Sequence, residues 1–102
     1  MPIEGPPLIS MAKAGGSLSA NTNAEVLGAD MQRQTVFINN LSTNQVIYIE
    51  FGAAASTTAT DGSWALNHDE PPLILSVEDF PEIRNSINLK STGTPQYVVR
   101  TA

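Results

Sequence analysis

The chain has 102 residues, which is enough for one compact domain and leaves little for a second hydrophobic core. Ten acidic residues against five Lys and Arg give a formal net charge of -5, so we expect repulsion from a phosphate backbone and predict no nucleic-acid binding. Cysteine is absent, which excludes disulfides and thiolate metal sites, and no apolar run approaches the roughly 18 residues of a membrane span.

Residues 1–17 are predicted to be an extended N-terminal arm. Three prolines fix φ and remove backbone donors, and the pair Gly15 and Gly16 costs much entropy to order, so the segment should not form a strand by itself. A basic stretch followed by an apolar one is missing, so we predict no signal peptide and no anchor. Two interpretations stay open: a disordered terminus, or an arm that becomes ordered on an adjacent subunit. Four apolar residues could be buried on such a partner, namely Ile3, Leu8, Ile9 and Met11.

The remaining residues, 18–102, are predicted to form one β domain. Short alternating or apolar runs recur between turn residues, which is typical of an all-β fold: a small antiparallel sandwich or a jelly-roll-like barrel of about seven strands. The predicted strands are Ala24–Gly28, Met31–Asn39, Gln45–Phe51, Ser63–Leu66, Leu73–Val77, Ile83–Leu89 and Gln96–Thr101.

Residues 33–52 have the clearest pattern, in which two alternating runs flank a short Asn/Ser/Thr segment. This predicts a β-hairpin with Val36 and Ile38 in the core. The Asn40-Leu41-Ser42 triplet matches a glycosylation acceptor but is explained more simply as the turn. One of two rows of the second run should join the core, either Val46 and Tyr48 or Ile47, Ile49 and Phe51.

The last two predicted strands differ in their faces. Along 83–89 the row of Ile83, Ile87 and Leu89 is apolar and the alternate row is polar, which predicts one core face and one wet face. Along 96–101 both faces carry apolar groups. That strand is therefore expected to be central, or its second face meets another chain.

Two connections carry information of their own. Residues 53–61 are small and rich in Ser and Thr, which compete with helical hydrogen bonding, so we predict a mobile loop with a contact role rather than a helix. Residues 67–72 form a polar turn that ends in a proline pair. Prolines at that place indicate an edge strand or a strand start.

Candidate catalytic and metal-binding groups are few. His68 beside Asp69 and Glu70 could be an acid/base pair, which would make the chain a small hydrolase, the last of the functions considered. One histidine is too few for a zinc site. We therefore expect a solvated turn. Glu78, Asp79 and Glu82 lack calcium-loop spacing and predict a solubilising loop in which Phe80 tucks onto the core.

Nucleophile-elbow and phosphate-loop signatures are also missing, so we predict no enzyme activity, no cofactor and no metal. Trp64 could stack on a sugar, together with other aromatic residues such as Tyr97. We favour core positions for these rings, because large rings supply much of the burial in a small core.

One stretch of the chain resembles small virion structural proteins of tailed bacteriophages. The resemblance covers residues 33–66 and includes the final strand at 97–100; after Leu66 the chain departs from the family pattern, with Asn67-His68-Asp69-Glu70-Pro71-Pro72 in place of a Pro-Gly type turn. The matching residues are Arg33, Val36, Ile38, Asn40 and Ser42, then Val46, Tyr48, Ile49, Phe51 and Gly52, then Trp64 and Leu66.

The resemblance implies a non-enzymatic role in the virion, as a capsid cement or decoration protein, a head fibre, or a tail or connector part, often as a symmetric oligomer. We expect a homotrimer that binds the major capsid protein through its arm and the 53–61 loop. The site residues expected to contact partners are Ile3, Leu8, Ile9, Met11, Trp64 and Tyr97. A carbohydrate-binding module that uses Trp64 is the alternative from another class.

Overall fold

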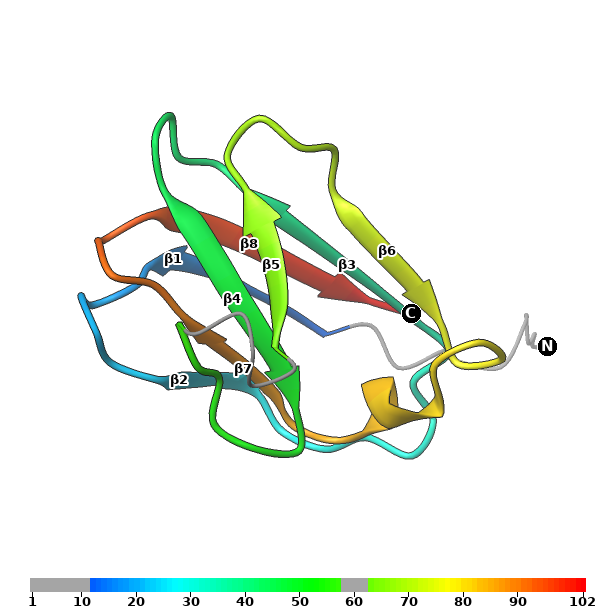
Figure 1. Cartoon of the computed structure of the whole chain (residues 1–102). Helices are drawn as coiled ribbons and strands as arrows, with labels where there is room; N and C mark the ends of the chain where they lie inside the picture. Colours follow the sequence, from blue (N-terminus) through cyan, green and yellow to red (C-terminus); the bar gives the residue numbers. More distant parts are fainter. Residues whose placement is uncertain (1–11, 58–62) are drawn as a thin grey trace, which may run out of the picture.

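The structure is a computed structural model that describes residues 12–57 and 63–102. The described chain is all-β, as the sequence predicts, with eight strands and one short 3-10 helix (Figure 1). The elements are β1 (Lys13–Ser17), β2 (Ala24–Leu27), β3 (Thr35–Asn40), β4 (Val46–Phe51), β5 (Trp64–Asn67), β6 (Leu73–Ser76), η2 (Pro81–Arg84), β7 (Ile87–Lys90) and β8 (Gln96–Thr101).

The strands form two antiparallel sheets, with the orders β1-β8-β3-β6 and β2-β7-β4-β5. Each strand of the first half pairs with one of the second: β1 with β8, β2 with β7, β3 with β6 and β4 with β5. The chain is thus one long antiparallel ribbon that doubles back between β4 and β5, and successive pairs of the ribbon alternate between the sheets. This arrangement is a jelly roll, in which the two sheets face each other as layers (Figure 1).

The predicted hairpin at 33–52 is wrong, because β3 and β4 lie in different sheets and do not pair. Residues 41–45 carry the chain from one sheet to the other. The alternating pattern is satisfied all the same, since each strand turns one row inward from opposite sides. Val36 and Ile38 are fully buried, and the row of β4 that joins them is Ile47, Ile49 and Phe51.

The core lies between the sheets and is aliphatic for the most part. Full burial of each such side chain contributes about 1.5–3 kcal/mol, so close packing between the layers is the main stabilising term. Its members are Leu18, Val36, Ile38, Ile47, Ile49, Phe51, Leu66, Leu75, Ile83, Ile87, Leu89 and Val99.

The predicted arm overlaps a strand, because Lys13–Ser17 form β1 and pair with β8 along their whole length. A boundary at residue 17 therefore falls at the end of a strand of the sandwich rather than at its start. The strand is hard to predict from the sequence because Gly15 and Gly16 have low strand propensity. β8 provides the backbone hydrogen-bond partners that the segment lacks by itself. The arm residues Ile3, Leu8, Ile9 and Met11 lie outside the described residues.

Three other boundaries and faces differ from prediction. β3 begins at Thr35 rather than at Met31, and Pro81 starts η2 where a strand was expected from Ile83. The alternation along 83–89 predicts a solvent-facing side chain at Asn88, but Asn88 is only 4% exposed. Its side chain accepts a hydrogen bond from Asn23, whose Oδ1 accepts the N–H of Ala55 in the loop that follows β4.

Parts of the predictions for the connections are confirmed, while the mobility and contact role of the 53–61 loop stay predictions. Residues 53–57 contain no helix, while 58–62 lie outside the described residues. The proline pair precedes β6, which is an edge strand, and β8 is a central strand between β1 and β3. Among the described residues, no helix is both long and apolar enough to cross a membrane.

Candidate functional site

The side of the β1-β8-β3-β6 sheet that points away from the core, called the outer face below, is the candidate site. Val36, Ile38 and Val99 point inward and are fully buried, so alternate residues along each strand must point outward. Pairing in the sheet places these residues in rows across the strands. The outer face consists of Lys13, Gly15, Ser17, Thr35, Phe37, Asn39, Ile74, Ser76, Gln96, Val98 and Arg100.

Apolar side chains form the floor of the outer face. Ile74 is 63% exposed, and Phe37 and Val98 are half-buried. Phe37 is the register partner of Ile74 on one side and of Arg100 on the other. Two adjoining pockets lie over this floor, one bounded by Phe37, Asn39, Val98 and Arg100 and the other by Lys13, Ala14, Gly15, Val98 and Arg100. The absence of a side chain at Gly15, which pairs with Val98, leaves the floor open on that flank.

Two cations stand directly opposite each other on this floor. Lys13 and Arg100 are register partners in the β1–β8 pair, and both side chains are exposed. Neither has an ion pair or hydrogen bond with any described residue. Like charges at directly opposed positions of an antiparallel pair repel, so this arrangement costs stability in the isolated chain.

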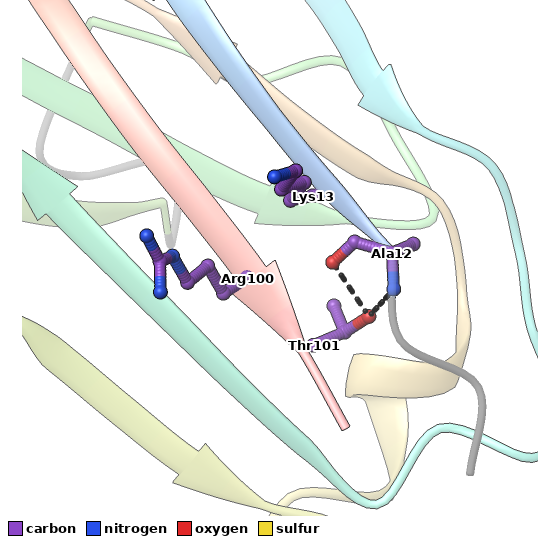
Figure 2. A pocket seen from close by; sticks show the side chains of 4 residues that line it. All are labelled: Ala12, Lys13, Arg100 and Thr101. Atoms are coloured by element: carbon purple, nitrogen blue, oxygen red, sulfur yellow. Dashed lines mark hydrogen bonds between the residues drawn. The ribbon is translucent and has the colours of Figure 1, made fainter. Parts of the chain in front are cut away.

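The backbone beneath the two cations is fixed by Thr101 (Figure 2). The Ala12 N–H donates to Thr101 Oγ1 at 3.0 Å, and Thr101 Oγ1 donates to the Ala12 carbonyl at 3.1 Å. These contacts and the residues Lys13 and Arg100 bound a third pocket. The chain therefore enters the described structure at the margin of the outer face, beside the cation pair.

The charge of the outer face is opposite to that of the chain. None of its eleven residues is acidic and two are cationic, whereas the chain has a net charge of -5. On the corresponding side of the other sheet, Glu25 and Glu50 flank Asn88 in one row. A cationic and apolar surface on an acidic protein is suited to a partner that offers carboxylates and apolar side chains.

The two aromatic residues predicted to contact partners face the core. Trp64 is the register partner of the buried Ile49, and its ring meets Phe80 edge-to-face with 5.3 Å between ring centroids. Tyr97 pairs with the buried Asn40 and packs against the core. Neither residue lies on the outer face. Phe80 tucks onto the core as predicted.

The polar turns show no convergence of catalytic groups. His68, Asp69 and Glu70 are exposed, and Glu70 Oε1 accepts the Asn67 N–H at 2.6 Å, which closes the turn. Glu78, Asp79 and Glu82 are exposed as well. Within residues 12–57 and 63–102, no group of three or more His, Cys, Asp and Glu could hold a metal ion.

Arg33 has a structural role. It is 1% exposed, and its guanidinium donates to the carbonyls of Ile83, Asn85 and Gly28 at 2.8 to 2.9 Å. The pKa of Arg33 is lowered, because the effect of burial is larger than the opposing effect of the nearby Asp30 charge. The side chain thus joins the β2–β3 connection to η2 and to the residue that follows it.

Asn40 also has a structural role. Its Nδ2 donates to the carbonyls of Gln45 and Leu66, both at 2.9 Å, and its Oδ1 accepts from the N–H and hydroxyl of Ser42. All four contacts hold the corner between the sheets. Because Nδ2 is buried and uses both hydrogens, the folded chain does not offer Asn40 to a glycosyltransferase.

Sequence reasoning missed most of the outer face. The sequence pattern predicts an arm that contains Lys13 and Gly15, and a hairpin that contains Phe37. The doubly apolar pattern at 96–101 was the available signal, since it places Val98 on a second apolar face of a central strand. The register that sets Phe37 and Lys13 on either side of Arg100 could not be read from the sequence.

The chain matches no known family model, no curated protein and no solved structure.

Proposed function

We propose that this chain is a non-enzymatic structural protein of a bacteriophage virion, most simply a capsid cement or decoration protein that binds the major capsid protein and stabilises the particle. The observation that carries the proposal is the outer face, a surface that joins a floor of Phe37, Val98 and Ile74 to two cations with no ion pair among the described residues. An exposed surface of this kind on a small rigid sandwich serves adhesion rather than chemistry.

The fold and the sequence pattern support the same function. Jelly rolls build viral capsid and lectin domains, although a fold alone does not assign a function. The residues of the phage-like motif, Arg33 and Asn40 among them, hold the sandwich together, so the resemblance supports a shared scaffold. A lectin-like use of Trp64 gains no support, because its ring packs on Phe80 and the core.

Attachment would depend on several weak contacts acting together. In a homotrimer three copies present their capsid contacts together, and the effective concentration of the second and third contacts exceeds that of the free protein. The proposal places the chain in the virion, after synthesis in the host cytoplasm.

Co-sedimentation tests the proposal. The purified chain should pellet with particles of the phage that carries its gene, at a stoichiometry set by the capsid lattice, and should raise the temperature at which they release DNA. A chain that stays in the supernatant at every concentration tested contradicts the proposal.

A further inference from the structure

We propose that the outer face is the receptor for residues 1–11 of a second copy of this chain, so that copies join head to tail by exchanging their N-terminal segments. This inference deepens the proposed function, because it assigns the contact that builds the oligomer. It rests on three observations: the chemistry of the outer face, the composition of residues 1–11, and the place where the described chain begins.

The composition of residues 1–11 is complementary to that of the outer face. Glu4 is the one charged side chain of residues 1–11, and Ile3, Leu8 and Ile9 are apolar. The outer face offers Lys13 and Arg100 above an apolar floor and has no acidic residue. A carboxylate between the two cations would turn their mutual repulsion into two attractions, and the apolar side chains would cover Phe37, Val98 and Ile74.

The geometry of the chain permits the exchange. Ala12, where the described chain begins, is fixed on Thr101 at the margin of the outer face. Eleven extended residues reach at most about 36–40 Å, and four strands spaced about 5 Å apart make a face narrower than that. A segment leaving one copy is therefore long enough to cross the outer face of a neighbour.

The prolines reduce the cost of ordering the segment. Pro2, Pro6 and Pro7 have φ fixed before binding, so less backbone entropy is lost when the segment becomes ordered. Their missing N–H groups do not matter on the face of a sheet, where the backbone hydrogen bonds are already used between strands. The contact is accordingly one of side chains on side chains.

The symmetry of such a contact limits the assembly. A segment that binds the next copy makes a head-to-tail interface, which closes into a ring when the rotation between copies permits. A ring of three closed in this way is the homotrimer expected from the family resemblance. In it each copy gives one segment and receives one.

A charge swap in the full-length chain tests the contact. Glu4→Lys alone, or Lys13→Glu with Arg100→Glu, should weaken the association constant measured by sedimentation equilibrium at least about tenfold, because like charges then meet. The chain that carries all three substitutions should recover most of the lost affinity. Lys90→Glu, on the other sheet, is the matched control and should leave association unchanged.

Mixing the two variants separates exchange between copies from binding within one chain. The Glu4→Lys chain and the Lys13→Glu/Arg100→Glu chain have complementary segments and faces, so the mixture should contain assemblies that neither forms alone. Phe37→Ser should weaken association of the wild-type segment without changing the far-UV circular dichroism.

Several results would overturn the inference. These are a wild-type chain that stays monomeric up to millimolar concentration, a triple variant that recovers nothing, a mixture without new assemblies, or association unaffected by Phe37→Ser. Failure here is distinct from failure of the proposed function, because a chain that binds capsids with the charge variants unaffected keeps the function and loses only this contact.

Discussion

Asn40 and Leu66 lie in opposite sheets and are joined by a hydrogen bond of 2.9 Å from Asn40 Nδ2 to the Leu66 carbonyl. The same amide group donates to Gln45 and accepts twice from Ser42. One side chain thereby joins Ser42 and Gln45 at the corner to Leu66 in the other sheet. The corner is where β3 leaves one sheet and β4 enters the other.

Replacing Asn40 with Ala should lower the free energy of unfolding by about 2–3 kcal/mol, because the buried bond to the Leu66 carbonyl and the bond to the Gln45 carbonyl are both lost. Urea unfolding with an unchanged m-value would measure this. Asn44→Ala, in the same turn at an exposed position, is the control and should change the free energy by less than about 0.5 kcal/mol. Equal effects at both positions would show that the corner does not depend on the amide.

Replacing Arg33 with Met should destabilise the chain by about 3 kcal/mol, since three carbonyls lose a charged donor that is 1% exposed. Arg33→Lys should recover only part of this, because one ammonium cannot match the fork of the guanidinium. Gln32→Ala, at an exposed neighbouring position, serves as the control.

The effect of Arg33 on stability should not depend on pH between 6 and 9. Burial lowers its pKa, and a base whose folded pKa is depressed gains relative stability only when the pH rises toward that pKa. A guanidinium stays protonated throughout this range in both states. Chemical denaturation of the wild type and of Arg33→Met at pH 6 and pH 9 should therefore give the same difference, and a difference that grows with pH would contradict a charged Arg33.

Gly52 should not tolerate a side chain. Its φ is +83°, and a Cβ there would lie 3.2 to 3.4 Å from the Asn85 side chain, so Gly52→Ala should cost about 1–2 kcal/mol. Gly28 is the matched control, because φ there is not positive and no atom lies within 4 Å of an added Cβ. Gly28→Ala should be neutral or slightly stabilising in the same thermal unfolding assay.

The sequence was sufficient for the fold class and for most of the core, because alternation and turn residues are local signals. It did not reveal which strands pair. Residues 33–52 have the pattern of a hairpin, but the same inward rows arise when two strands face each other from opposite sheets, which is how β3 and β4 lie. β1 was missed because Gly15 and Gly16 have no strand propensity, and its pairing with β8 spans most of the chain.

The outer face illustrates the same limit for function. Val98 and Arg100 could be assigned to a second face of a central strand, but their neighbours Phe37 and Lys13 are brought in by pairings between distant segments. For Trp64 the sequence suggests a functional role that its packing does not support. An aromatic residue after a loop suggests a binding platform. In the structure the Trp64 ring packs on Phe80 and against the edge of the core.

Trp64 allows a direct test of the carbohydrate-binding alternative. Trp64→Ala should lower the free energy of unfolding by about 3 kcal/mol, because it removes the edge-to-face contact with Phe80 and leaves a cavity beside Ile49. Trp64→Phe should retain most of the stability, since a ring remains against Phe80. On a glycan array the wild type and Trp64→Phe should give the same signals at every sugar. If the wild type instead binds a particular glycan and Trp64→Phe loses that binding while remaining folded, the ring is a ligand platform and the structural assignment of Trp64 is wrong.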